Sequence, residues 1–173
     1  VITIPAANET KLQETVKKAT EIYKAEIIAK DPGLQISADA TATPAFVIDA
    51  CTQARLTDAI IACPNGAVRM IDSMPDTVET SNNLAIIKSE NGKITVVTLM
   101  RSSVESAKEA MAQTIQAVGE LAKADSIVFA GAYPGWKPNP DSAILKEMQE
   151  IYFKLYQKQP AIMAIHAGLE CGI

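Results

Sequence analysis

The clearest hydrophobic pattern in the chain is a pair of apolar runs on either side of Asn91-Gly92. Glycine tolerates the positive φ of a tight hairpin turn, and asparagine tolerates it better than most residues. The second run is rich in Val, Ile and Thr, which favour a pleated and half-buried strand. The pattern therefore predicts a β-hairpin with strands at residues 80–88 and 93–101.

A helix is predicted directly after the second strand, at residues 103–123. Its apolar positions recur at helical spacing: Val104, Ala107, Met111, Ile115, Val118 and Ala122. Ser102 and Glu105 match the S-x-x-E capping box. Arg101 therefore stands where the sheet meets the helix start, a suitable place to hold a carboxylate. The alternative is a strand-end arginine that points into water, the default for charged residues.

Periodicity and chain-breaking residues predict the remaining elements. Helices are expected at residues 8–30, 44–62 and 141–157, strands at 1–4, 34–40, 126–130 and 161–165, and a loop at 66–78 with the option of a short strand at 67–71. Residues 34–132 then follow the βαββαβ order of a ferredoxin-like unit. We expect an α+β fold with a four-stranded antiparallel sheet and both helices on one face. An uncovered outer strand is a natural place for strand-to-strand dimer pairing.

The segments outside this unit look like connections to neighbours. Residues 1–33 hold a strand and a helix that precede it, and residues 133–173 follow it. The chain starts within a strand-like run without an initiator Met and ends without a polar tail. We expect a fragment of a longer protein, with a processed mature protein as the alternative.

Composition narrows the classes of function. The chain has 173 residues, 48% of them hydrophobic, and a formal charge of −4 without a basic run, which argues against a nucleic-acid partner. It has neither a membrane-length apolar stretch nor a signal-peptide pattern. Cys51, Cys63 and Cys171 form no C-x-x-C motif, so they read as free thiols in a reducing compartment, the cytoplasm.

The candidates for chemistry gather near the end of the chain. His166 is the sole histidine, and Gly168 argues against a helical metal pair with Glu170. Because a catalytic zinc site needs three protein ligands, this chain is not expected to complete one alone. Cys171 with His166 could form a nucleophile and base, although no thiol-protease motif accompanies them and a buried cysteine is the plainer interpretation. The turn at Gly168 and Gly172 either presents N–H groups to an anion or is an ordinary strand exit.

Tyr133 and Trp136 lie in a stretch rich in proline and glycine. Aromatic residues in such a turn either line a pocket or pack at a hinge between domains. The sequence leaves both interpretations open.

Several segments together resemble a known family. CPNGAVRM is followed by VETSNN, by a strand ending in LMRSS, and then by GAYPGW and IHAGLECG. In this order and spacing they resemble the aminoacyl-histidine dipeptidases, carnosinase-like dizinc exopeptidases related to carboxypeptidase G and aminoacylase. The resemblance covers the whole chain, weakly over residues 1–60 and strongly after residue 125.

The resemblance implies a two-domain enzyme. One domain carries two zinc ions, and the other is a βαββαβ lid that is often used for dimerisation. Residues 34–132 match the lid, and residues 133–173 match a partial return into the missing catalytic domain. The zinc ligands and the catalytic glutamate of the family match no residue in this chain.

The resemblance also assigns binding residues in the lid. Arg101 matches an arginine at a strand end that binds the substrate's C-terminal carboxylate through its planar fork. Asn83 matches the asparagine of a T-S-x-N pattern that offers an amide to the substrate backbone. Thr80 and Ser81 stand beside it in the same pattern.

The resemblance also assigns binding residues near the end of the chain, and two residues of the lid differ from the family's usual pattern. The HAGLECG turn matches a segment that lines the substrate pocket, which carries over His166, Gly168 and Glu170. Asn82 and Ala85 stand where a leucine and a glycine are more usual in this family.

The implied function is the lid and substrate-carboxylate-binding portion of a zinc-dependent dipeptidase that hydrolyses aminoacyl-histidine dipeptides. Two zinc ions would activate a water in the parent enzyme, and this chain alone is expected to be inactive. Its partners would be a short peptide, its own catalytic domain and a second copy, without nucleic acid or membrane. The alternatives are a stand-alone ferredoxin-like binding or dimerisation module and a small thiol hydrolase.

Overall fold

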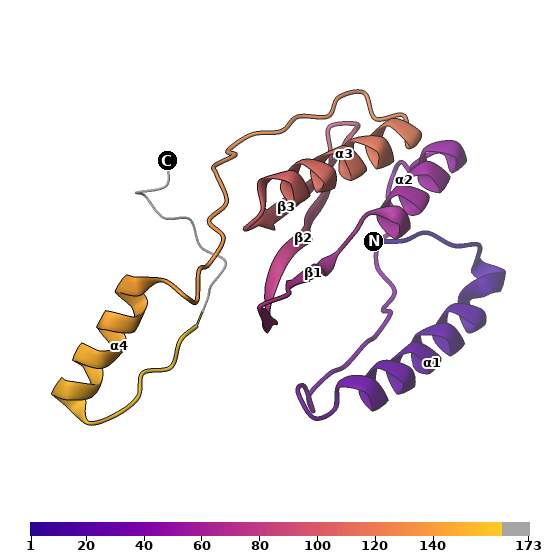
Figure 1. The fold of residues 1–173 in the computed structure, drawn as a ribbon. Helices are drawn as coiled ribbons and strands as arrows, with labels where there is room; N and C mark the ends of the chain where they lie inside the picture. The colour runs from indigo at the N-terminus through magenta and orange to yellow at the C-terminus, as the bar shows by residue number, and fades with distance from the viewer. Residues whose placement is uncertain (164–173) are drawn as a thin grey trace. The chain divides into compact units, whose positions relative to one another are not determined.

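The hairpin around Asn91-Gly92 forms as its sequence predicts, in a computed structural model that describes residues 1–163 (Figure 1). Strand β2 (Met74–Glu90) pairs antiparallel with β3 (Lys93–Ser102). Asn91 and Gly92 have φ values of 52° and 72°, the left-handed pair that a two-residue hairpin loop requires. Strand β2 begins several residues earlier than its apolar pattern indicates.

A third strand, β1 (Gly66–Ile71), pairs antiparallel with β2 and gives the sheet order β1-β2-β3. The optional short strand at residues 67–71 therefore forms, and the loop predicted for residues 66–78 was wrong, because most of this range belongs to β1 and β2. The β2–β3 register shifts between Leu84 and Ile86, so Ala85 is an additional residue opposite Thr98 and Val97. Such a β-bulge bends the strand and locally increases its twist.

One face of the sheet is covered by a helix. Helix α3 (Glu105–Leu121) packs on β3 and β2, and α2 (Ala50–Ala62) packs on α3 (Figure 1). Met111 of α3 and Ile71 of β1 are the buried apolar side chains in the part of the chain that is described. The amphipathic stripe predicted for residues 103–123 therefore turns inward at Met111, and the helix itself is confirmed.

Residues Val1–Asp49 form a compact unit of their own. A 3-10 turn, η1 (Ala6–Asn8), leads into helix α1 (Glu9–Ile27), which confirms the first predicted helix. The Gln13 side chain donates a hydrogen bond to the carbonyl oxygen of Ala38 at 3.0 Å. The Thr20 hydroxyl donates to the carbonyl oxygen of Val16 at 2.7 Å and lies 3.4 Å from the carbonyl oxygen of Ile36. Side chains of α1 thus hold the extended segment that follows it.

The strands predicted at residues 1–4, 34–40 and 126–130 do not form, which corrects the expected four-stranded sheet. Residues 34–40 do alternate between half-buried and exposed, as their sequence predicts, but their polar contacts come from α1. A strand needs a neighbouring backbone to pair with, and an alternating pattern does not specify one. The sheet of the described chain has three strands, and the ferredoxin-like arrangement is not confirmed.

Two further boundaries differ from the sequence prediction. The helix expected at residues 44–62 begins only at Ala50, so Pro44 precedes it by a loop. Helix α4 (Ala143–Tyr156) confirms the helix expected at 141–157. No strand forms at residues 161–163, and the rest of the expected final strand lies outside the described residues.

Many large apolar side chains remain exposed to solvent. Helix α4 packs against no other helix or strand within residues 1–163, and Ile144 and Leu155 on it are 67% and 70% exposed. Within the same residues, none of the helices is both long and apolar enough to cross a membrane.

Candidate functional site

Three residues that the sequence singles out share one face of the sheet. Ser81 lies directly opposite Arg101 across the β2–β3 ladder, and Asn83 lies opposite Leu99. Side chains directly opposite each other, and those two residues apart on one strand, point to the same side. Arg101 and Asn83 are exposed and Ser81 is half-buried. The register thus brings a guanidinium, an amide and a hydroxyl together on a solvent-facing surface.

An open hollow of about 550 Å³ adjoins this surface. Its lining comes from the starts of β1 and β2 and from the middle of β2: Asn65, Gly66, Ala67, Asp76, Thr77, Val78, Ser81, Asn82 and Asn83. Five of these nine residues have an amide or hydroxyl side chain, and Asp76 carries the one formal charge. The hollow therefore offers hydrogen-bonding groups beside the position that faces Arg101.

Thr80 lies on the opposite, helix-covered face of the sheet, where it is 3% exposed. Its hydroxyl lies 2.9 Å from the hydroxyl of Ser102 and donates to Glu79 Oε1 at 3.3 Å. Ser102 Oγ in turn accepts the backbone N–H of Val104 at 3.1 Å. A direct role for Thr80 in ligand binding stays a prediction, and this placement favours a supporting role.

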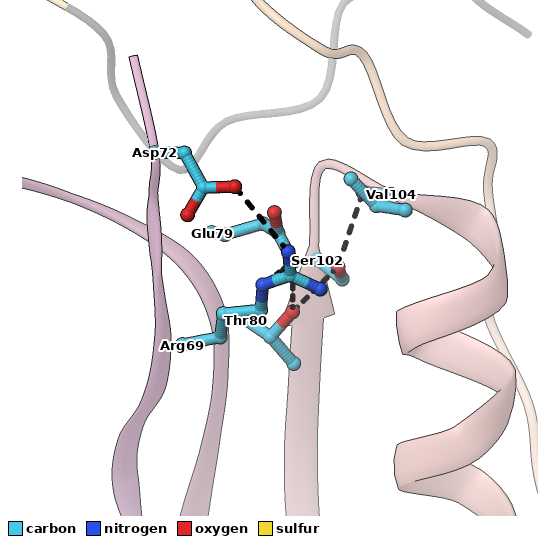
Figure 2. A network of polar contacts seen from close by, with 6 residues as sticks. All are labelled: Arg69, Asp72, Glu79, Thr80, Ser102 and Val104. Atoms are coloured by element: carbon cyan, nitrogen blue, oxygen red, sulfur yellow. Dashed lines mark hydrogen bonds and ion pairs between the residues drawn. The ribbon is translucent and has the colours of Figure 1, made fainter. Parts of the chain in front are cut away.

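Glu79 is a buried carboxylate that anchors the same network. Its side chain is 6% exposed, and Arg69 Nε lies 3.4 Å from its Oε1 (Figure 2). Arg69 also reaches Asp72 on the surface, at 3.6 Å. A buried carboxylate without a partner is costly, and Arg69 supplies that partner. The contact ties β1 to β2 close to the candidate site.

The start of α3 differs from the predicted capping box. Val104 is the N-cap, and Ser102 Oγ accepts the N–H of Val104 rather than that of Glu105. The Glu105 carboxylate lies 2.6 Å from Lys108 Nζ and accepts the N–H of Gly135 at 3.4 Å. These two hydrogen bonds, that of Lys108 first, lower the pKa of Glu105. The capping-box prediction was wrong because the glutamate has better partners within the tertiary structure.

Sequence reasoning missed the structural role of Asn82. It is 1% exposed, and its Nδ2 donates to Pro64 O at 2.7 Å and to Cys63 Sγ at 3.8 Å. Its Oδ1 finds no partner among the described residues. Burial raises the pKa of the Cys63 thiol, and the bond from Asn82 opposes that change. The departure from the family's leucine was the signal in the sequence, because a buried amide needs a partner.

The tail residues His166, Gly168, Glu170 and Cys171 lie outside the described residues. Within residues 1–163, no cluster of three or more His, Cys, Asp or Glu side chains is arranged to hold a metal ion. The donors of this part of the chain therefore do not fit a dizinc centre, and we assign no metal-dependent step to them.

The chain is similar to known dipeptidases over nearly its whole length. It is 32% identical over 172 residues to the cytosol non-specific dipeptidase of Escherichia coli (strain K12), covering 99% of this chain and 35% of that protein. The chain is therefore homologous to a segment that makes up about a third of that dipeptidase's length. No protein-family model matches it.

A solved structure gives the same result. The crystal structure of aminoacylhistidine dipeptidase from Vibrio alginolyticus is 42% identical, with a TM-score of 0.89, over 98% of this chain and 34% of that one. The resemblance read from the sequence motifs is thus confirmed. The chain spans about a third of the length of both relatives.

Proposed function

We propose that this chain is the lid portion of a zinc-dependent dipeptidase and holds the C-terminal carboxylate of an aminoacyl-histidine substrate. One observation carries the proposal: Arg101 faces Ser81 and lies near Asn83 on an exposed sheet face beside an open hollow. Homology to two dipeptidases supports it.

The chemistry of these side chains suits a peptide terminus. A guanidinium donates two parallel N–H bonds to the two oxygens of a carboxylate, which fixes orientation as well as affinity. The amide of Asn83 can both donate to a peptide carbonyl and accept from a peptide N–H. A lid that grips a free carboxylate at a fixed distance from the scissile bond admits short peptides and excludes longer ones.

The hydrolytic chemistry itself is assigned to the rest of the full-length protein. Two zinc ions bound there would polarise the peptide carbonyl and activate the attacking water. His166, Gly168 and Glu170 are proposed to line the pocket at the end of this chain. The chain by itself is therefore expected to contribute binding and to show no turnover.

The proposed partners are the catalytic domain of the same protein and a second copy of it. Within residues 1–163, the outer edges of β1 and β3 pair with no further strand, and such edges readily accept a strand from another segment or subunit. We propose a cytoplasmic location, as in the E. coli relative, whose name places it in the cytosol.

The test replaces Arg101 in the full-length protein. Arg101→Met removes the guanidinium group, and Arg101→Lys keeps the positive charge but cannot form the bidentate pair. With β-alanyl-histidine, Arg101→Met is expected to raise KM about 10- to 100-fold, since hydrogen bonds to charged groups contribute roughly 1.5–3 kcal/mol. Arg101→Lys should recover part of that loss.

A matched substrate makes the test specific. For the C-terminal amide of the same dipeptide, wild type and Arg101→Met should differ little, because the carboxylate is already missing. An equal effect on both substrates would contradict the carboxylate site.

The alternative of a stand-alone binding module makes a different prediction. It expects no dipeptidase activity even in the full-length protein with zinc supplied. Homology to dipeptidases over 98–99% of the chain disfavours this alternative.

A further inference from the structure

The corner between β3 and α3, directly after Arg101, is in close contact with a distant turn. A Cβ atom built on Gly135 would lie 2.7 Å from the carbonyl oxygen of Ser102 and 2.9 Å from the carbonyl carbon of Ser103. Both are backbone atoms, which cannot swing aside as the end of a side chain can. The turn at residues 133–135 therefore lies so close to this corner that only a glycine fits at position 135.

Two side chains from the first turn of α3 hold the turn in place. Lys108 Nζ donates to the carbonyl oxygen of Tyr133 at 2.7 Å, and Glu105 Oε2 accepts the N–H of Gly135 at 3.4 Å. Lys108 and Glu105 are themselves paired at 2.6 Å. The Lys108 side chain is 19% exposed and the Glu105 side chain is 55% exposed, so only the lysine is shielded from water.

The same corner is held from its other side by β2. The N–H of Ser103 donates to the carbonyl oxygen of Glu79 at 3.0 Å, and the hydroxyls of Ser102 and Thr80 lie 2.9 Å apart. Figure 2 shows the Thr80–Ser102 contact together with the link from Ser102 to Val104. The two residues that follow Arg101 are thus fixed between a strand and a turn.

We propose that the turn at residues 133–135 is a brace for this corner, and that Gly135, Glu105 and Lys108 are positioning residues for Arg101. The inference rests on the proposed carboxylate site and deepens it. A bidentate guanidinium tolerates little error in position, so loosening the corner weakens the grip on the carboxylate without touching the substrate. This proposal gives the GAYPGW segment a structural role, which its sequence had left open.

The experiment compares two glycine substitutions in the full-length protein. Gly135→Ala forces the added methyl against the Ser102–Ser103 backbone. Gly33→Ala is the matched control, because its Cβ meets only Asp31 Oδ1, at an ordinary 3.7 Å. Gly135→Ala is expected to raise KM for β-alanyl-histidine about 5-fold, in the range of measured couplings between contacting sites, with kcat nearly unchanged. Gly33→Ala should leave both constants unchanged.

A double-mutant cycle shows whether the brace acts through Arg101. In an Arg101→Met background, Gly135→Ala should change KM less than 2-fold, because nothing remains to be positioned. For the C-terminal amide of the dipeptide, Gly135→Ala should also have almost no effect. Lys108→Met, which removes the bond to Tyr133 and the pair with Glu105, should reproduce the pattern and replaces Gly135→Ala if that variant does not fold.

The outcomes separate this inference from the carboxylate site itself. If Arg101→Met raises KM for the free acid alone while Gly135→Ala and Lys108→Met do not, the brace is wrong and the carboxylate site stands. If Arg101→Met has no selective effect, the carboxylate site is wrong. An equal loss from Gly135→Ala in both Arg101 backgrounds would show a general structural role and overturn the inference.

Discussion

Asn82 and Asn83 are neighbours in the sequence with opposite environments. Strand alternation turns Asn82 toward the helix-covered face and Asn83 toward solvent. The first donates to Pro64 O and connects the loop after α2 to the sheet. The second stands on the Arg101 face. A single step along a strand thus separates a structural amide from a candidate binding amide.

Alanine substitutions at these two positions should therefore separate stability from affinity. Asn82→Ala leaves the Pro64 carbonyl without its donor and should lower the free energy of unfolding by about 1–3 kcal/mol. Asn83→Ala, its matched control, should change stability by less than about 0.5 kcal/mol and raise KM for β-alanyl-histidine. Urea denaturation and steady-state kinetics on both variants measure this, and a larger stability loss in Asn83→Ala would contradict the assignment.

Glu105 gives the brace a defined pH dependence. Its hydrogen bonds with Lys108 and Gly135 lower its pKa below that of the unfolded chain. A lowered pKa in the folded state contributes stability above the unfolded pKa, and this contribution is lost as the pH falls through the folded pKa. The stability difference between wild type and Glu105→Gln should thus be largest near neutral pH and shrink in acid. A difference that grows as the pH falls would refute it.

At the scale of elements, the sequence correctly predicted the helices and strands whose hydrogen-bond partners are close by in the chain. The hairpin closes on its own two-residue loop, and α1, α3 and α4 carry their own periodicity. The strands expected at residues 34–40 and 126–130 failed because each needs a backbone partner from elsewhere. The predicted alternation of half-buried and exposed positions at residues 34–40 was correct. The pattern did not specify which element covers the half-buried side.

The hairpin loop offers a direct test of its local control. Gly92 has a φ of 72°, so Gly92→Ala should destabilise the protein by about 1–2 kcal/mol, the cost of left-handed backbone for a residue with a Cβ. Asn91→Gly, at a φ of 52° in the same loop, should be tolerated within about 0.5 kcal/mol. Thermal unfolding compares the two, and equal losses would mean that the turn does not set the hairpin.

At the scale of the whole molecule, the chain is rich in hydrophobic residues, but the core of its described part is small. The chain is 48% hydrophobic, yet Ile71 and Met111 are the buried apolar side chains in the described part. Exposed apolar side chains gathered on one element are typical of surfaces that contact another domain or subunit. This exposure agrees with homology to about a third of a dipeptidase.

The isolated chain should therefore behave differently from the full-length protein. We expect the 173-residue chain to bind a hydrophobic dye and to self-associate in gel filtration, because helix α4 exposes Ile144 and Leu155. Replacing both with glutamate should reduce the dye binding and self-association of the isolated chain, and the full-length protein should not bind the dye. A monomeric isolated chain without dye binding would refute this account of the apolar surface.

The sequence by itself determined the α+β class, the hairpin, most helices and the resemblance to dipeptidases, since these depend on local periodicity, turn chemistry and contiguous motifs. It also singled out Arg101, Asn83 and Ser81, which strand register then placed on one face. Only the tertiary structure decided which strands pair, that Thr80 turns away from that face, and that Glu105 binds Lys108 and Gly135 instead of capping its helix. These outcomes depend on contacts between residues far apart in the chain, and no local pattern of hydrophobic and polar residues encodes them.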